Sequence, residues 1–329
     1  MRALQDWLAG IDGFSGAALM PATADASFRR YFRTAAGGQS YIVMDAPPER
    51  EDSSRFVTIS GYLRQMGLNC PRIIHADLKQ GFLIISDLGH RQYLDELNRN
   101  PAATTPLYQD AMAALLTLQS AGRAFQQKLP PYDEELLRFE LSIFTEWLCG
   151  RHLGIEFDRG ELLQWQNCCD TLVRSALAQP RVFVHRDFHS RNLMLTPDNN
   201  PGILDFQDAL EGPLTYDLVS LLRDCYLELP VQTVQEWVRD FVDNLPEDLP
   251  DRPGADEFTM RFDLMGAQRH LKAAGIFARL LHRDGKTEYM KDVPRTLGYV
   301  SRVAETHDDL GFLKTLIDER CLPRLGELA

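Results

Sequence analysis

The sequence predicts an α+β protein built from two lobes, a small β-rich lobe followed by a larger helical one. Residues 16–89 read mostly as strands separated by turn residues, and the rest of the chain has the apolar spacing of helices. At 329 residues the chain is also long enough to bury two hydrophobic cores. We therefore expect an N-terminal lobe over residues 1–89 and a helical lobe over residues 90–329.

The first lobe is predicted to be a small sheet with one helix. Before it, residues 1–8 have the pattern of a short amphipathic helix and lack the apolar core of a signal peptide. Residues 53–66 have helical periodicity that ends at Gly67, a residue type that often follows the last helical turn. A turn at residues 35–38 joins two of the strands. The predicted strands are 17–20, 27–34, 39–46, 73–76 and 81–86.

The second lobe is predicted to be helical, with proline and glycine between the helices. Three short apolar stretches interrupt the helices and read as strands, at residues 182–184, 193–195 and 202–204. A functional site is expected in the cleft between the two lobes. The predicted helices are 105–121, 133–151, 160–178, 216–227, 231–244, 257–282 and 287–305.

The composition argues against several classes of protein. A net charge of −12 is unfavourable for a nucleic-acid-binding surface. No apolar run approaches the length that crosses a membrane. The six cysteines are scattered without Cys-x-x-Cys spacing, which predicts buried, reduced thiols in a cytoplasmic protein.

The strongest functional signal is the segment 185–192, His-Arg-Asp-Phe-His-Ser-Arg-Asn, with Asp-Phe at 205–206. Each part follows a short apolar stretch, so its polar side chains are expected at the ends of two neighbouring strands. Asn192 follows Asp187 by five residues, and Asp205 comes thirteen residues after that. Phosphoryl transfer from a nucleotide needs this set, because one carboxylate orients the attacking hydroxyl while an Asn and an Asp hold magnesium.

Two other interpretations of this segment are weaker. A surface β-hairpin with turn-capping acids explains each acid singly but not their order. A metal site could use His185, Asp187 and His189, which alternate along the chain and could share one face of a strand. That site would leave Asn192 and Asp205 without a role, and His185 is more simply a packed histidine that supports the loop.

These motifs resemble the aminoglycoside phosphotransferase and choline kinase-like superfamily, which is related to the protein kinases. Within it, the chain is most similar to the bacterial kinases that phosphorylate N-acetylmuramate and N-acetylglucosamine at the anomeric hydroxyl. The resemblance implies a two-lobed protein-kinase-like fold, ATP and Mg²⁺ as cofactors, a small-molecule sugar acceptor and a place in peptidoglycan recycling. The segments that carry the closer match are DASFRRYFR at 25–33, YIVMDAPP at 41–48, GFLIISDLG at 81–89 and QRHLK at 268–272.

The resemblance also implies roles for single residues. Asp187 is expected to be the catalytic base, and Asn192 and Asp205 the magnesium ligands. Residues 25–28, with the Ser27 hydroxyl, are expected to cover the phosphates. A matching Asp in the superfamily supports the catalytic loop, so Asp217 either does this or is an ordinary acid at a helix N-terminus. The remaining predicted residues are Ser86, Asp87 and Leu88 at the adenine-binding hinge and His189 in support of the loop.

One position departs from the family pattern. The third strand usually carries a lysine for the α- and β-phosphates, but Met44 stands there and a thioether cannot donate to a phosphate. No lysine precedes residue 79. The preceding strand offers arginines instead. Arg29 and Arg33 share one face of it, and Arg30 lies on the other; we take Arg30 and Arg33 as candidate phosphate-binding residues.

The acceptor site is expected to be neutral or basic. Between residues 261 and 295 the chain has eight Lys and Arg against four Asp and Glu, although the whole chain is acidic. A neutral or anionic acceptor fits that charge better than a cationic one. Arg269 and Lys272, three residues apart on one helix face, are the main candidates, although a solvated basic face explains them too. The other predicted acceptor residues are Arg191 and Tyr216, with Arg223 a weaker candidate.

Two classes of function therefore follow from the sequence. The first is an ATP-dependent amino-sugar kinase, with an aminoglycoside or choline kinase as the alternative within the same class. The second is a kinase-like protein that binds nucleotide without turnover. This class is suggested by Met44, which stands where the family pattern has a lysine.

Overall fold

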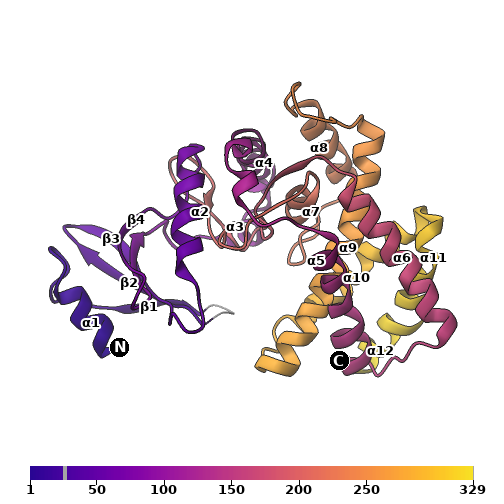
Figure 1. The fold of residues 1–329 in the computed structure, drawn as a ribbon, viewed down its shortest axis with the longest axis horizontal. Coiled ribbons are helices and arrows are strands. Elements are labelled where there is room, and N and C mark those ends of the chain that lie inside the picture. Colours follow the sequence, from indigo (N-terminus) through magenta and orange to yellow (C-terminus); the bar gives the residue numbers. More distant parts are fainter. Residues whose placement is uncertain (25–27, 329) are drawn as a thin grey trace. The chain divides into compact units, whose positions relative to one another are not determined.

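The computed structural model describes residues 1–24 and 28–328 of the chain (Figure 1). Its contacts group the chain into two compact units, each made of two segments. The first unit contains Met1–Leu118 and Arg191–Ala209, and the second contains Gln119–Ser190 and Leu210–Ala329. The predicted α+β class is confirmed, with a β-sheet in the first unit and mostly helices in the second. The predicted lobe boundary at Gly89 stays a prediction.

The first unit contains a five-stranded antiparallel sheet, which confirms the predicted sheet-rich lobe. Helix α1 (Arg2–Ala9) places Leu4 and Leu8 in an apolar cluster with Val43 and Ile84 of the sheet. The first strand lies a few residues later than predicted, and the turn after the second is limited to the two glycines that follow Ala36, both with positive φ. The strands in spatial order are β1 (Met20–Ala24), β2 (Arg30–Ala36), β3 (Gln39–Asp45), β5 (Phe82–Ser86) and β4 (Ile73–Asp77).

Helix α2 (Ser53–Gln65) confirms the predicted helix of this unit. The Asp52 carboxylate accepts a hydrogen bond from the backbone N–H of Ser54 at 2.9 Å and so caps the first turn. The Phe56 ring packs against Phe206 with 4.7 Å between the centroids. The helix thus contacts the segment that carries Asp205.

A short hairpin from the middle of the sequence completes the first unit. Its strands are β7 (Leu193–Met194) and β8 (Gly202–Ile203), and it pairs with earlier parts of the chain through Asn69 and Gln92. These bridges explain why residues 191–209 group with the first unit although they lie within the sequence of the second. Helix α3 (Tyr93–Arg99), which was not predicted, and helix α4 (Thr104–Ala121) follow the sheet along the chain.

The second unit is built around α9 (Ala255–Asp284), a 30-residue helix that packs against most of its helical neighbours (Figure 1). The helices over 134–177, 231–243 and 255–284 lie within two residues of their predicted ranges, whereas the helical segments after Thr306 were not predicted. The other α- and π-helices of the unit are α5 (Glu134–Ile143), a π-helix (Phe144–His152), α6 (Arg159–Leu177), α7 (Tyr216–Leu222), α8 (Val231–Asp243), α10 (Val293–Thr306), α11 (Gly311–Thr315), a second π-helix (Leu316–Cys321) and α12 (Leu322–Leu328).

Three differences from the predicted elements have local causes. Helix α7 ends five residues early, because the Asp224 carboxylate accepts the backbone N–H of Tyr226 and turns the chain. Helix α10 begins six residues late, with Pro294 in its first turn, where proline fits best. Strands β6 (Arg181–Val184) and β9 (Leu210–Pro213) form an antiparallel pair, and β9 was missed because Leu-Glu-Gly-Pro has no strand pattern.

Other expectations from the composition can also be compared with the structure. All six cysteines are buried and none is in a disulfide, as predicted. In the part of the chain that the structure describes, no helix combines the length and the apolar character needed to cross a membrane.

Replacing Gly275 by Ala is expected to destabilise the protein by about 1–3 kcal/mol, because a Cβ at this position of α9 would lie 2.6 Å from backbone atoms of Ile143 and Phe144. Gly298 is the matched control, since the nearest atom to an added Cβ there is 3.8 Å away, in the flexible Arg302 side chain. Gly298→Ala should be neutral or stabilising by about 0.5–1 kcal/mol. Denaturant unfolding of both variants measures the difference, and equal stability would contradict the close helix approach.

Candidate active site

The predicted catalytic loop leaves strand β6 of the second unit and is held by Asp217. The Asp217 carboxylate accepts hydrogen bonds from the backbone N–H groups of His185 at 2.6 Å and Arg186 at 3.0 Å. Complete burial raises the pKa of Asp217 to about 7, and the nearby Asp187 charge adds to the rise. Arg186 has φ 80°, a left-handed conformation that a non-glycine residue adopts only where its surroundings impose it. These contacts fit the predicted supporting role of Asp217.

The two histidines of the loop lie inside the second unit. His185 is fully buried, and its Nδ1 accepts the backbone N–H of Asp187 at 3.2 Å. His189 is also buried, with its ring edge-on to Tyr226. Ser190 closes the loop by donating its backbone N–H to Asp224 at 2.9 Å. The loop conformation is therefore set mainly by buried side chains beneath it.

Asp187 is half-buried and lies among positive charges. Burial alone would raise the pKa of its carboxyl group, but the charges of Lys272, His189, Arg186 and Arg269 more than offset this, and the pKa lies below its usual value. The carboxylate is therefore ionised at neutral pH and can accept a hydrogen bond from a hydroxyl group.

A buried ionic network lies next to Asp187 in the second unit. Glu140 of α5 pairs with Arg186 and with Lys272, whose Nζ lies 3.0 Å from the carboxylate. The hydroxyl of Tyr132 also donates to Glu140, and the Nζ of Lys272 donates to the Tyr216 hydroxyl at 3.0 Å. Burial opposes ionisation of Glu140, but the two cations hold its pKa below the usual value. Glu140 was not predicted, although it contacts Arg186, Lys272 and Tyr132.

This network changes the interpretation of the predicted acceptor residues. Lys272 and Tyr216 are buried and hydrogen-bonded to each other. These contacts fit residues that support the site more than residues that bind the acceptor directly. Arg269 differs, because its side chain is buried and, among the described residues, donates a hydrogen bond to Cys225 Sγ at 3.8 Å and not to an oxygen acceptor. A buried guanidinium normally has carboxylate or carbonyl acceptors. Arg223, the weaker candidate, pairs with Asp263 instead.

The predicted magnesium ligands lie together in the first unit. The side-chain amide of Asn192 donates a hydrogen bond to the Asp205 carboxylate at 3.2 Å. The backbone carbonyl of Asn192 accepts a hydrogen bond from the backbone N–H of Leu204 at 2.9 Å. Asp205 has φ 62° and also accepts a hydrogen bond from Gln207 at 2.8 Å. A carboxylate and an amide at this separation can both offer oxygen to one hard cation, so the pair fits Mg²⁺. Arg191, which precedes Asn192, is half-buried in the same unit.

The predicted nucleotide-binding residues have different partners. Arg33 donates to the Asp87 carboxylate at 2.6 and 3.1 Å and to the Gly89 carbonyl at 2.9 Å, so these residues bind each other at the hinge. Arg30 is exposed and pairs with Asp45. The Ser86 hydroxyl accepts a hydrogen bond from the backbone N–H of Arg72 at 2.8 Å, and Leu88 lies next to Gly202. Ser27 lies outside the described residues.

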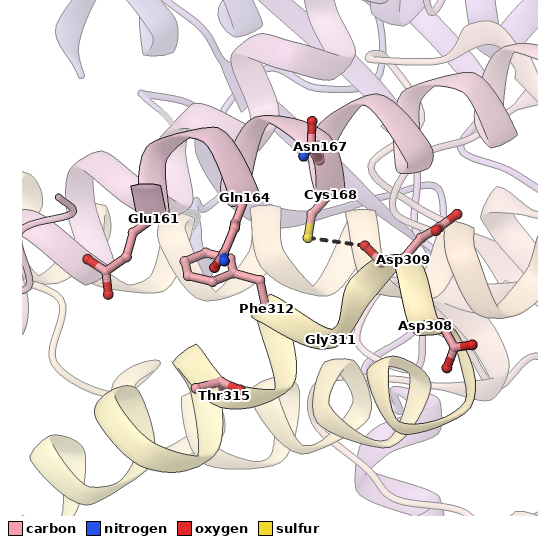
Figure 2. Close-up of a pocket in the computed structure, with 9 residues that line it drawn as sticks. All are labelled: Glu161, Gln164, Asn167, Cys168, Asp308, Asp309, Gly311, Phe312 and Thr315. Carbon is pink, nitrogen blue, oxygen red and sulfur yellow. Dashed lines mark hydrogen bonds between the residues drawn. The ribbon is translucent and has the colours of Figure 1, made fainter. Parts of the chain in front are cut away.

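Two alternatives to this site are a metal site and a separate pocket. Among the described residues, no group of three or more His, Cys, Asp or Glu is placed to hold a metal, so the alternative site at His185, Asp187 and His189 is not formed. A separate pocket of about 440 Å³ lies between α6 and the segment around α11 (Figure 2). Its lining, which includes Glu161, Asp308 and Phe312, contains none of the motif residues.

This chain belongs to the phosphotransferase enzyme family, whose model matches residues 18–258. Curated relatives cover nearly the whole chain. A protein of Pseudomonas aeruginosa named N-acetylmuramate/N-acetylglucosamine kinase is 47% identical over 306 residues, which is 92% of this chain and 88% of the relative. A protein of the same name from Neisseria meningitidis serogroup B is 42% identical over 328 residues, 96% of this chain and 94% of the relative. The family resemblance found in the sequence is confirmed.

Solved structures support the fold independently. The choline kinase LicA from Streptococcus pneumoniae matches with a TM-score of 0.62 and 11% identity over 92% of this chain and 98% of that one. The ADP-bound aminoglycoside phosphotransferase APH(2'')-Ib matches with a TM-score of 0.57 and 14% identity, over 87% of this chain and 94% of that one. At this identity the likeness concerns the fold, which is the predicted two-lobed kinase-like fold.

Proposed function

We propose that this chain uses ATP and Mg²⁺ to phosphorylate N-acetylmuramate and N-acetylglucosamine at the anomeric hydroxyl, as a step of peptidoglycan recycling in the cytoplasm. The single observation that carries the proposal is the 47% identity, over 92% of the chain, to the kinase of that name. The motif residues supply the required chemical groups. Buried thiols without disulfides are typical of a reducing compartment.

In this proposal each predicted residue has a separate role. Asp187 accepts the proton of the attacking sugar hydroxyl and orients its oxygen, a role that its ionised state permits. Asn192 and Asp205 would hold the magnesium, which neutralises charge on the phosphates when bound. Asp217 and His185 keep the catalytic loop in position through its backbone.

The charge around Asp187 favours a neutral or anionic acceptor. The segment 261–295, which contains Arg269 and Lys272, has eight Lys and Arg against four Asp and Glu. A cationic aminoglycoside or choline would be repelled by this excess. N-acetylmuramate has a lactyl carboxylate, and Arg269 is the buried donor best suited to bind it.

An acceptor screen tests the proposed function. Magnesium-dependent ADP release would be measured with N-acetylmuramate, N-acetylglucosamine, kanamycin and choline at equal concentration. We expect turnover of both amino sugars and none of the two cations. Robust turnover of kanamycin or choline would contradict the proposed acceptor, and ADP release with no acceptor at all would indicate a different enzyme.

Substitution of Arg269 is expected to separate the two sugars. Arg269→Ala should lower kcat/KM for N-acetylmuramate about 10- to 100-fold, the size expected for a lost charge-assisted hydrogen bond. The loss for N-acetylglucosamine, which has no carboxylate, should be several-fold smaller. Lys272→Ala is the matched control, because breaking the Glu140 network should affect both sugars alike. Equal losses in Arg269→Ala would remove Arg269 from carboxylate recognition.

A further inference from the structure

Arg186, the residue before Asp187, is held through both its backbone and its side chain. Its φ of 80° is a left-handed conformation, which costs free energy in a residue with a Cβ and persists only where several contacts enforce it. The backbone N–H of Arg186 donates to the Asp217 carboxylate at 3.0 Å, and its guanidinium pairs with the Glu140 carboxylate. Because the two residues are consecutive, a change of backbone angle at Arg186 would also move Asp187.

The Glu140 carboxylate is buried, and both of its oxygens have partners in the second unit. Oε1 lies against the guanidinium of Arg186 and 3.0 Å from the Nζ of Lys272. Oε2 accepts hydrogen bonds from the Tyr132 hydroxyl and, at 3.2 Å, from the side-chain amide of Gln268. That amide also donates to the Tyr132 hydroxyl at 3.1 Å. Glu140 cannot move without leaving buried donors unpaired, so it is a fixed partner for Arg186.

Stability alone is a weak explanation for this buried ionic group. Removing a carboxylate and two cations from water is costly, and well-packed apolar side chains in place of a buried ion pair often give an equally stable or more stable protein. Here one of the cations belongs to the catalytic loop itself, directly before Asp187. The arrangement therefore favours a role in placing that loop.

We propose that Glu140 is a positioning residue for the catalytic loop. It holds the guanidinium of Arg186, keeps Arg186 in its left-handed conformation and so fixes the Asp187 carboxylate where it can accept the proton of the acceptor hydroxyl. Glu140 itself needs no contact with either substrate. This assignment rests on the proposed function, because turnover of the sugar reports the position of Asp187.

Steady-state kinetics with ATP and N-acetylglucosamine tests the assignment. This sugar has no carboxylate, so recognition by Arg269 does not contribute. We expect Glu140→Gln to lower kcat about 10- to 100-fold, since a misplacement of about 1 Å at a reacting group can cost about 100-fold, and to leave the KM for ATP unchanged. Glu135→Gln, an exposed position of the same helix with the same change of charge, is the matched control and should equal wild type.

The split between kcat and KM separates positioning from simple stabilisation. Glu140→Gln leaves Arg186 and Lys272 without their carboxylate and should also lower the melting temperature. For this reason kcat is expressed per folded molecule, with the folded fraction taken from the melting curve. A residue that only stabilises the fold would lower the melting temperature and leave this kcat unchanged.

A double-mutant cycle tests whether Glu140 acts through Arg186. Arg186→Met leaves Glu140 paired with Lys272, so it avoids an unpaired buried carboxylate. We expect Arg186→Met to lower kcat as Glu140→Gln does, and the double variant to have the kcat of Arg186→Met alone. Losses that multiply in the double variant, or wild-type kcat in folded Glu140→Gln, would overturn the assignment.

Two further outcomes are also decisive. If Glu140→Gln does not fold, Arg186→Met alone decides, because wild-type kcat in that variant would overturn the assignment as well. If the wild type phosphorylates neither amino sugar, the proposed function fails and the assignment falls with it. Normal turnover by the wild type together with unaffected variants would contradict the assignment alone.

Discussion

Asp187→Asn is expected to lower kcat for sugar phosphorylation by about 10²- to 10⁴-fold, the range that a positioned general base contributes. An amide has nearly the same shape as the carboxylate, but it cannot take the hydroxyl proton. The substitution also removes one negative charge from among Lys272, Arg186 and Arg269. Nucleotide affinity should remain close to wild type, because Asp187 is expected to orient the acceptor hydroxyl and not to hold the phosphates.

The measurement is steady-state turnover of N-acetylmuramate together with ATP affinity. Asp198→Asn is a suitable control, because Asp198 is exposed and its substitution removes the same single negative charge. It should leave kcat unchanged. A circular-dichroism melting curve for Asp187→Asn would show whether the fold is retained. Near wild-type kcat in a folded Asp187→Asn variant would remove Asp187 from the catalytic role.

Asp205→Ala and Asn192→Ala are each expected to raise the magnesium concentration for half-maximal activity about tenfold or more. Loss of groups that merely orient metal ligands typically costs 10- to 100-fold, so loss of an oxygen ligand should cost at least as much. The two side chains are joined by a 3.2 Å hydrogen bond, and removal of either would leave one oxygen ligand fewer for the ion. Asp205→Ala should have the larger effect because it removes a charge.

Magnesium titrations of the two variants at saturating ATP and sugar would test this. The KM for the sugar should change little, since neither residue is expected to contact the acceptor. Gln207→Ala gives a graded control, because Gln207 donates to Asp205 at 2.8 Å without being a candidate ligand. Titration curves that superimpose on wild type for both variants would show that the metal assignment is wrong.

Elements with strong periodicity could be predicted from the sequence, and short elements could not. The alternating pattern around Tyr31 and Ile42 identified two paired strands, and the glycine after α2 marked its end. Strand β9 has only four residues, with Gly212 and Pro213 among them, and its pairing with β6 is a long-range contact. No local pattern encodes such a contact, because the hydrogen bonds depend on the partner strand.

The motif residues were predicted because the chemistry requires them at fixed spacing, whereas their supporting residues come from distant parts of the chain. Glu140 looks like an ordinary helix acid in the sequence. One signal for Glu140 was present, since it lies three residues after Leu137 and four before Phe144, on the buried face of its helix. A charged residue in an apolar stripe indicates a buried ionic partner.

The hairpin of β7 and β8 has a consequence for the order in which the protein can fold during synthesis. Residues 1–118 emerge from the ribosome first, but their contacts to Phe206, Gly202 and Met194 do not exist until residue 209 has been made. Until then the ring contact between Phe56 and Phe206 is missing, and the apolar surface that it covers is prone to aggregation. The first unit therefore completes its core only after the first 72 residues of the second unit, Gln119–Ser190, have already been synthesised. A fragment that ends at residue 118 should consequently be less stable than its sheet alone would suggest.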